Sequence, residues 1–266
     1  DSLHAGGIAW YGTYLYVADT AKGFRVFDMN YIFDLSEADN GDTNDKYRIG
    51  LENGKYYAHG YRYVMPQVAA WSSVIARDPN KTCTADAGSP TFSFTAIDRS
   101  TSAHLITGEF CADDIANGDI NKSGRVFRWP IDSNTGQPKL TDDIWQANAI
   151  YRLPISNIQG AVSYKNIWYL SRSQGLSNGI LYVTKPISSN NGTLEIDTAH
   201  YAAVGPEDLS HWPKTDGSPG GLWTVTEHAG RRLYVCNIGN LNNNTELHRI
   251  CGPNPNAYPG FLPGGD

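Results

Sequence analysis

The sequence is poor in charge, and what charge it has is not basic. Only 18% of its 266 residues are charged, and the formal net charge is −6. Binding of a nucleic acid backbone needs a concentrated basic surface, so this class of partner is excluded. The sequence also lacks any run of about 18 apolar residues, and therefore predicts no membrane-crossing helix.

Long stretches with helical periodicity are absent as well. The sequence consists instead of short alternating or aromatic runs, separated by clusters of Gly, Asn, Asp and Pro. This pattern is typical of strands joined by turns. Hydrophobic residues make up 40% of the chain and aromatic residues 12%, enough to bury a sizeable core. These features predict an all-β protein.

There are only four cysteines and no C-x-x-C pair. An even number of cysteines in a chain of this composition predicts two disulfides and an oxidising compartment. The sequence starts at Asp1, as a processed chain would. Four N-x-S/T motifs indicate a glycosylated, secreted eukaryotic protein; they begin at Asn80, Asn121, Asn191 and Asn243.

Four segments repeat the same arrangement of strand, turn, strand, polar loop and strand. They span residues 6–29, 92–131, 159–185 and 207–237, the second with a long loop before its third strand. One further strand follows each segment, in 61–71, 149–156, 200–206 and 246–252. Units of four strands are the blades of a β-propeller, because stacking in a ring buries their faces.

The fold prediction is therefore a single β-propeller domain over residues 1–266. Four blades are recognisable, which is a small number for a closed ring, so we expect the chain to be the C-terminal part of a larger propeller. A missing N-terminal segment of the same protein would complete it. A β-sandwich of unrelated strands is the alternative. Residues 36–55 are polar and predict a surface loop inserted in the first blade.

This blade assignment predicts how the cysteines pair. Cys83 lies in the loop before the second blade, and Cys111 lies in the loop between the second and third strands of that blade. Those two kinds of loop share one face of a propeller, so the two cysteines can meet. Cys236 and Cys251 lie in neighbouring antiparallel strands of the last blade. We therefore expect disulfides Cys83–Cys111 and Cys236–Cys251.

The same face is where function is expected, because loops on a rigid scaffold tend to carry it. Its residues come from the starts of the first strands and the ends of the second strands. The former supply His4, Gln67, Gln159, Glu207 and Asp208, and the latter supply Asp19, Glu109, Ser171, Arg172, Glu227 and His228. The alternative for each of them is a structural role, in which it satisfies nearby backbone groups.

Two features of this face favour ligand binding. His4 is followed by Gly6 and Gly7, which would let a ligand or another backbone approach closely. Asp119, Asn121, Ser123 and Gly124 have the spacing of the first half of a calcium loop. The twelfth position is Pro130, so the segment is not an EF-hand, and Asn121 is also a glycosylation motif. Calcium bound by Asp119 and Asn121 remains a hypothesis.

Four segments resemble a known group of proteins. HAGGIAWYGTYLYVADT, GYRYVMPQV, GPEDLSHWP and LWTVTEHAGRR are similar to secreted propeller proteins of fungi and actinobacteria, which resemble the L-rhamnose-α-1,4-D-glucuronate lyases of gum-arabic-type arabinogalactan. The resemblance implies a seven-bladed ring and more sequence before His4. It also implies that His4 is an acid or base, that Arg172 and Gln159 contact the uronate, and that Tyr63 is a weaker catalytic candidate.

The first functional hypothesis is thus an extracellular polysaccharide lyase with a carbohydrate substrate. Its catalytic candidates are His4, Tyr63 and Arg172, and its substrate-binding candidates are Gln67, Glu109, Gln159, Glu207 and His228. The second hypothesis is a lectin-like propeller without catalysis. A glycoside hydrolase would need two carboxyl groups about 5–9 Å apart, and Glu207 with Glu227 is the pair to test. A scaffold for protein interactions is the last alternative.

Overall fold

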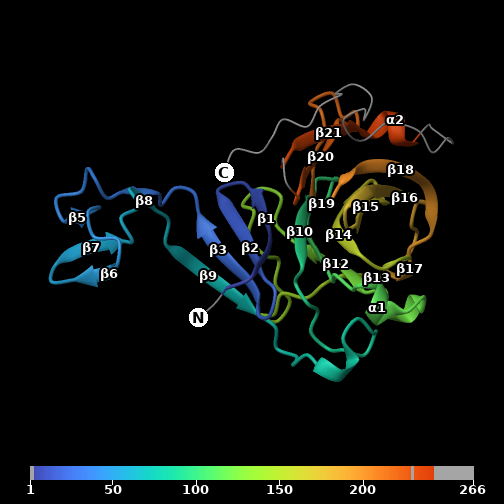
Figure 1. Ribbon diagram of the computed structural model, residues 1–266, viewed down its shortest axis with the longest axis horizontal. Helices are drawn as coiled ribbons and strands as arrows, with labels where there is room; N and C mark the ends of the chain where they lie inside the picture. Colours follow the sequence, from blue (N-terminus) through green and yellow to red (C-terminus); the bar gives the residue numbers. More distant parts are fainter. Residues whose placement is uncertain (1–2, 229–230, 243–266) are drawn as a thin grey trace.

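A computed structural model describes residues 3–228 and 231–242, and it is built almost entirely of antiparallel strands. Three sheets contain four strands that follow one another as a meander, one of them with a fifth strand added, and a fourth sheet has three described strands (Figure 1). This confirms an all-β fold with four-stranded antiparallel units.

The four sheets begin at the four repeats predicted from the sequence. The first contains β1 (Ala5–Tyr11), β2 (Tyr14–Asp19), β3 (Gly23–Asp28) and β9 (Gln67–Ser72). The second contains β10 (Phe94–Asp98), β11 (His104–Gly108), β12 (Arg125–Pro130) and β13 (Ala149–Arg152), with β17 (Asn191–Thr193) added in parallel. The third contains β14 (Ile158–Tyr164), β15 (Ile167–Gln174), β16 (Ser177–Thr184) and β18 (Ile196–Val204). The fourth contains β19 (Pro206–Trp212), β20 (Gly221–Thr226) and β21 (Leu233–Asn237).

Local sequence explains the tight turns between the first and second strands of these sheets. In the third sheet the turn between β14 and β15 consists of Lys165 and Asn166, with φ of 49° and 64°. Two consecutive residues with positive φ give a turn whose twist matches that of a hairpin, and Asn tolerates this conformation. The register of the inner hairpin follows from this turn.

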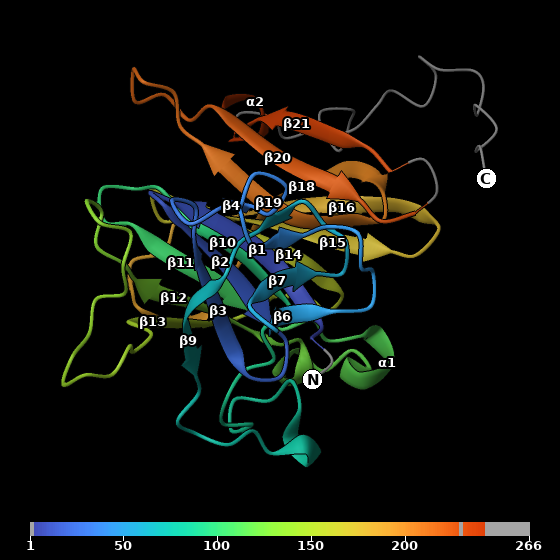
Figure 2. The same cartoon turned by 90° about the vertical axis from the view of Figure 1, so that its left-hand side faces the viewer.

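The first strands of the sheets lie next to one another. β1 contacts β10, β10 contacts β14, and β19 contacts both β14 and β10. One apolar core, around Trp168, Tyr151 and Leu170, lies among the second, third and fourth sheets. A second core, around Tyr16, Phe24 and Trp145, lies between the first and second sheets. The four first strands therefore form the centre of the molecule, with the outer strands around them (Figure 2).

The insertion in the first sheet is more structured than a loop. It is also longer than the predicted 36–55, and we use the name for residues 33–64. It contains a two-stranded sheet of β4 (Phe33–Asp34) and β8 (Tyr63–Val64), and a three-stranded sheet of β5 (Gly41–Asp42), β6 (Ile49–Glu52) and β7 (Lys55–Ala58). Figure 1 shows these small sheets extending away from the four large ones. Most of their side chains are exposed, which confirms the surface position predicted from the polar sequence. The strands themselves are not predicted from it.

Over residues 3–228 and 231–242, helices occur only as short turns in loops. They are α1 (Asp113–Ala116), α2 (Ile238–Asn242), η1 (Pro79–Lys81) and η2 (Ile120–Lys122). Among the described residues, no helix has the length and apolarity to cross a bilayer.

The disulfide Cys83–Cys111 is confirmed, with a Cα–Cα distance of 6.0 Å. It joins the loop after β9 to the loop after β11, so these two kinds of loop do share one face. Cys251 lies outside the described residues, and the Cys236–Cys251 pair stays a prediction. Of the glycosylation motifs, Asn80, Asn121 and Asn191 are exposed, and Asn243 lies outside the described residues.

Candidate functional site

Three of the four first strands begin with a bulge. The register shifts between Ala5 and Gly7 in β1, between Ile158 and Gly160 in β14, and between Pro206 and Leu209 in β19. A bulge aims an extra side chain away from its strand and is common next to functional sites. The extra residues are Gly6, Gln159 and, in β19, Glu207 with Asp208. The bulges of β14 and β19 therefore direct polar side chains to the same end of the central strands.

Asp208 lies where the central strands meet. Its carboxylate accepts hydrogen bonds from the backbone N–H groups of Ile8 in β1 and Thr95 in β10. Its Oδ1 atom is buried and has no hydrogen-bond partner among the described residues. Burial, and secondly the charge of Glu207, raise the pKa of Asp208 well above its usual range. Asp208 is therefore a carboxyl group that tends to keep its proton.

The glycines beside Asp208 make room for the protein itself. A Cβ atom at Gly7 would lie 2.1 Å from Asp208 Oδ2, and a Cβ atom at Gly6 would lie 2.2 Å from the backbone oxygen of Phe92. At Gly160 a Cβ atom would lie 2.8 Å from the Cα atom of Asp208. Of the two predicted roles of Gly6 and Gly7, close approach of another backbone is therefore confirmed, whereas the space expected for a ligand is already filled by the central strands.

Glu207 is half-buried, and two hydroxyl groups donate hydrogen bonds to its backbone. Its backbone oxygen accepts hydrogen bonds from Ser171 Oγ at 2.7 Å and from Thr224 Oγ1 at 3.3 Å. Its Oε1 atom is buried and has no hydrogen-bond partner among the described residues. Burial is the main cause that raises the pKa of Glu207 to about 7, and the charge and hydrogen-bonding contact of Glu227 add to it.

Glu227 follows β20 directly, and its backbone N–H donates to the backbone oxygen of Gly205 at 2.9 Å. Its side chain is exposed and faces Glu207. Two ionised carboxylates have no proton to donate to each other, so their contact becomes a hydrogen bond only when one is protonated. We call Glu207 and Glu227 the carboxyl pair. A pKa near neutrality allows this pair to take up and release a proton at physiological pH.

Glu109 has a structural role. It is buried and binds Arg125 through both carboxylate oxygens, at 2.7 Å to Nη2 and 3.0 Å to Nε. Arg125 Nη1 also donates to the backbone oxygen of Gly88, in the loop that carries Cys83. The carboxylate of Glu109 is thus used to anchor this loop, which argues against its role in substrate binding.

Arg172 lies at the correct end of β15 but is partly engaged. Its Nη2 atom contacts both carboxylate oxygens of Asp113 at 3.1 and 3.2 Å, and its Nε donates to the backbone oxygen of Ser156 at 3.2 Å. Asp113 belongs to α1 and also binds the side chains of Ser156 and Asn157. Gln159 lies half-buried on the neighbouring β14. The Nη1 atom of Arg172 is not used by these contacts.

The two histidines lie at the rim of the same end. His4 is exposed, and its Nδ1 atom is 2.8 Å from Thr20 Oγ1. His228 Nε2 is 3.1 Å from the backbone oxygen of Gly175, in the turn between β15 and β16. Its ring lies against Gly205, where a Cβ atom would be 2.7 Å from the imidazole. The structure thus places both histidines at the predicted end, His228 beside the fourth sheet.

Two other predicted residues lie elsewhere. Gln67 pairs with Phe27 at the far end of the first sheet, whereas the end that carries Asp19 pairs Gly23 with Ser72. Its assignment to the start of a first strand is wrong, because Gln67 begins the outermost strand β9. Tyr63 is exposed on β8, in the insertion outside the four large sheets. The sequence predicts one strand over 61–71, whereas Pro66 separates two strands, β8 and β9.

Asp119 and Asn121 form a local cap. Asp119 Oδ1 accepts hydrogen bonds from the backbone N–H of Asn121 at 2.9 Å and from its Nδ2 at 3.1 Å, at the start of η2. Within residues 3–228 and 231–242, no group of three or more His, Cys, Asp or Glu side chains has a geometry suited to a metal ion. Calcium at this loop stays a prediction that no second acidic ligand supports.

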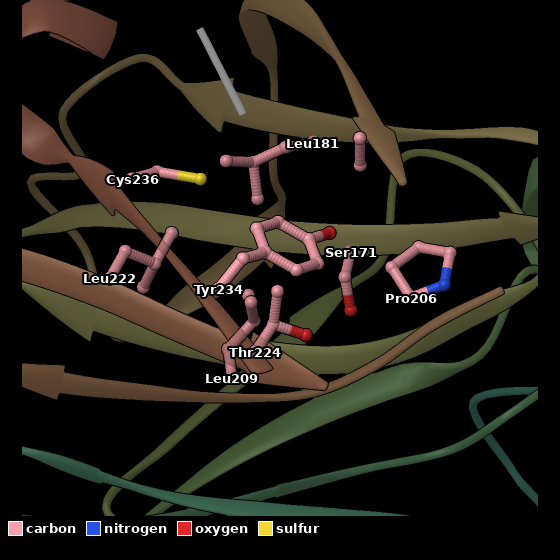
Figure 3. Close-up of a pocket in the computed structure, with 9 residues that line it drawn as sticks. Ser171, Leu181, Pro206, Leu209, Leu222, Thr224, Tyr234 and Cys236 are labelled. Atoms are coloured by element: carbon pink, nitrogen blue, oxygen red, sulfur yellow. The ribbon is translucent and has the colours of Figure 1, made fainter. Parts of the chain in front are cut away.

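A cavity between the third and fourth sheets lies below Glu207. Figure 3 shows it surrounded mainly by apolar side chains, among them Leu181, Leu209 and Leu222, together with the hydroxyl-bearing residues Tyr234, Ser171 and Thr224. The hydroxyls of Ser171 and Thr224 already bond the backbone oxygen of Glu207. The side chains around the cavity therefore help to hold the backbone of Glu207 in place.

Comparison with known proteins gives little that bears on this site. No family model matches the chain, and no curated protein matches it. One similar solved structure is described as a GH43 glycoside hydrolase whose active site was engineered to give both endo-xylanase and exo-arabinofuranosidase activity. The identity is 12% and the TM-score 0.43, over 86% of this chain and 37% of that chain. This chain therefore spans little more than a third of that protein.

Proposed function

We propose that this chain carries the acid–base site of an extracellular carbohydrate-active enzyme. The observation that supports it is the carboxyl pair, in which Glu207 has a pKa of about 7 and contacts Glu227 at the end of the central strands. Perturbed carboxyl groups of this kind are concentrated at catalytic sites. The Cys83–Cys111 disulfide and the exposed glycosylation motifs support an extracellular location.

The reaction that we propose is β-elimination at a 4-linked glucuronate, with release of rhamnose from arabinogalactan side chains. A base removes the proton from C5, the C4–O4 bond breaks, a double bond forms between C4 and C5, and an acid returns one proton to O4. The ionised member of the carboxyl pair is suited to the first step. His4, exposed at the rim, is suited to the second.

The uronate carboxylate needs a donor that stabilises the charge developing at C5. Arg172 is the candidate, since its Nη1 atom remains available beside Gln159 while Asp113 orients the rest of the guanidinium. A neutral, protonated Glu207 could also donate to that carboxylate. These assignments follow the resemblance to glucuronate lyases, with Glu207 and Glu227 added from the geometry.

Hydrolysis of a glycosidic bond by the carboxyl pair is the second candidate. Hydrolases of this kind keep their two carboxyl groups about 5–9 Å apart, so that the sugar or a water fits between them. Glu207 and Glu227 are instead in hydrogen-bonding contact. This closeness favours proton sharing over the hydrolytic arrangement, unless substrate separates the two groups.

We also propose that the four sheets are part of a larger propeller. The outer face of the fourth sheet exposes Trp223, Val225, Leu233 and Val235, which form two directly opposed cross-strand pairs. In the first sheet, Ile8 and Trp10 are exposed on β1. A cluster of exposed apolar side chains on one face of a sheet usually packs against another element. Further four-stranded units of the same kind would cover both faces.

Incubation with gum arabic tests the function. Lyase activity would give a product that absorbs in the ultraviolet because of its unsaturated uronate, together with free rhamnose. Hydrolysis would release sugar without that absorbance. Binding without release of any sugar would favour the lectin alternative. A Glu207→Gln variant that retained full lyase activity would contradict our assignment of the carboxyl pair.

A further inference from the structure

Arg99 is a half-buried cation at the end of the central strands opposite to the carboxyl pair. It follows β10, and its guanidinium reaches two other first strands. Nη1 donates to the backbone oxygen of His211 in β19 at 3.1 Å, and Nη2 donates to that of Trp10 in β1 at 2.9 Å. The guanidinium is thus fixed at the point where β1, β10 and β19 come together.

No carboxylate neutralises Arg99 within the described residues. Its neighbour in sequence, Asp98, is committed to Arg128 at 2.9 Å and to the hydroxyl of Ser163. Burial without an opposite charge lowers the pKa of Arg99 to about 10. A desolvated cation of this kind is costly unless an anion pairs with it. Two backbone oxygens use only two of its five N–H groups.

Aromatic rings flank this cation on two sides. The guanidinium carbon lies 3.9 Å from the centre of the Trp212 ring and 5.9 Å from that of Tyr11. Trp212 is 58% exposed, so the stacked guanidinium leaves much of its indole open to solvent. Tyr11 is fixed by a hydrogen bond from its hydroxyl to the backbone oxygen of Ser133. Lys165, on the next turn, adds a second positive charge to this end.

We propose that this end of the central strands, formed by Arg99, Trp212 and Tyr11, binds the carboxylate of an acidic sugar. The free N–H groups of Arg99 would hold the carboxylate, because a guanidinium presents parallel donors that match it. The exposed indole of Trp212 would pack against the apolar C–H face of the sugar ring. The site is separate from the carboxyl pair, and it would hold an acidic polysaccharide without cleaving it.

Calorimetric titration with glucuronic acid tests this site. If our proposed function also holds, the wild type binds two molecules per chain, and Arg99→Gln binds one. If the carboxyl pair does not bind sugar, the numbers are one and zero, so the two proposals fail separately. Trp212→Ala should weaken the Arg99 site by about tenfold or more. Because Trp212 is largely exposed, this variant keeps the test valid even if Arg99→Gln does not fold.

Matched controls are Trp223→Ala, another exposed tryptophan of the fourth sheet, and Arg62→Gln, an exposed arginine paired with Asp34 in the insertion. Both should bind as the wild type does. Carboxyl-reduced arabinogalactan should bind more weakly than the native polysaccharide. The proposal is overturned if Arg99→Gln and Trp212→Ala bind glucuronic acid as the wild type does. It is equally overturned if polyglutamate binds through Arg99 and glucuronic acid does not.

Discussion

Gly7 and Asp208 occupy the same small space: a Cβ atom on residue 7 would stand 2.1 Å from Asp208 Oδ2 and 2.9 Å from the backbone nitrogen of Thr95. The first and fourth sheets are therefore in contact here because the Asp208 carboxyl group packs directly against the backbone of Gly7, which has no side chain. This contact supports Asp208 and, through it, the adjacent Glu207. A larger residue at position 7 would therefore displace Asp208 and, with it, the adjacent Glu207 of the carboxyl pair.

Gly7→Ala should destabilise the protein by roughly 1–3 kcal/mol, as overpacking does in a closely packed interior. Chemical denaturation measures the loss. Gly54→Ala is the control, since Gly54 has φ of 77° but open space around it. That variant should cost only about 1 kcal/mol, from backbone strain alone. Equal costs at the two positions would mean that the central strands can separate to accept a methyl group.

Glu207 should make stability depend on pH. Its pKa of about 7 lies above the usual value of 4.5 for a glutamic acid, so between these values the folded state holds a proton that the unfolded state has released. The free energy of unfolding should therefore fall as pH rises from about 4.5 to 7, and level off above. Because Glu207 is only half-buried, the change should be a few kcal/mol at most.

Denaturation at pH 5 and at pH 8 measures this change, with Glu207→Gln as the comparison. The amide cannot titrate, so the variant should lose less stability than the wild type between the two pH values. Asp208 also has a raised pKa and contributes a fall in the same direction, which the variant retains. Identical pH profiles for the two proteins would show that Glu207 titrates normally.

The sequence identified much of the fold because each strand carries its own signal. Alternation and turn residues located the first three strands of every sheet and the last strand of the second and third sheets. Pro66 and the exposed insertion misled the assignment of 61–71, since a short strand of the insertion precedes β9. Contacts between residues far apart in the sequence have no local sequence pattern. The ion pairs of Glu109 with Arg125 and of Arg172 with Asp113 could therefore not be predicted.

Part of the candidate site could be predicted, and for the same reason. The position of Glu207 and Glu227 at the ends of neighbouring strands identifies them as a pair. The raised pKa of Glu207 could not be predicted, because it depends on burial by the third and fourth sheets. The burial of Arg99 without a carboxylate partner could not be predicted, since an arginine in a turn is ordinarily exposed to solvent.

Glu109→Gln should strongly destabilise the protein without acting on substrate directly. Removing one partner of a buried ion pair typically costs about 3–5 kcal/mol, because the other charge remains buried. Glu195→Gln is the control, since its pair with Lys185 is exposed and should contribute at most about 1 kcal/mol. Thermal denaturation compares the two. A similar, small loss for both would contradict the structural role of Glu109.

Breaking the Cys83–Cys111 disulfide should lower stability by roughly 3 kcal/mol, given the 28 residues that separate the two cysteines. The double variant Cys83→Ser/Cys111→Ser isolates this bond from the predicted Cys236–Cys251 pair. Denaturation of the variant and of the wild type without reductant measures the effect. The loop between β9 and β10 should also become more sensitive to proteolysis, because it would lose a covalent anchor and keep hydrogen bonds such as those from Arg125 and Arg152.

His4→Ala tests whether the rim histidine delivers a proton during catalysis. His4 is exposed and bonds only Thr20 at its Nδ1 atom, so its removal should leave the melting temperature nearly unchanged. Loss of general acid–base help typically lowers the rate by about 10²–10⁴-fold, and we expect a fall in kcat of this order on gum arabic. His59→Ala is the matched control, because His59 is equally exposed but belongs to the insertion, where its Nδ1 lies near the backbone oxygen of Lys46. That variant should turn over substrate as the wild type does. Full activity in His4→Ala, together with a large loss in Glu207→Gln, would remove His4 from the mechanism and leave both proton transfers to the carboxyl pair.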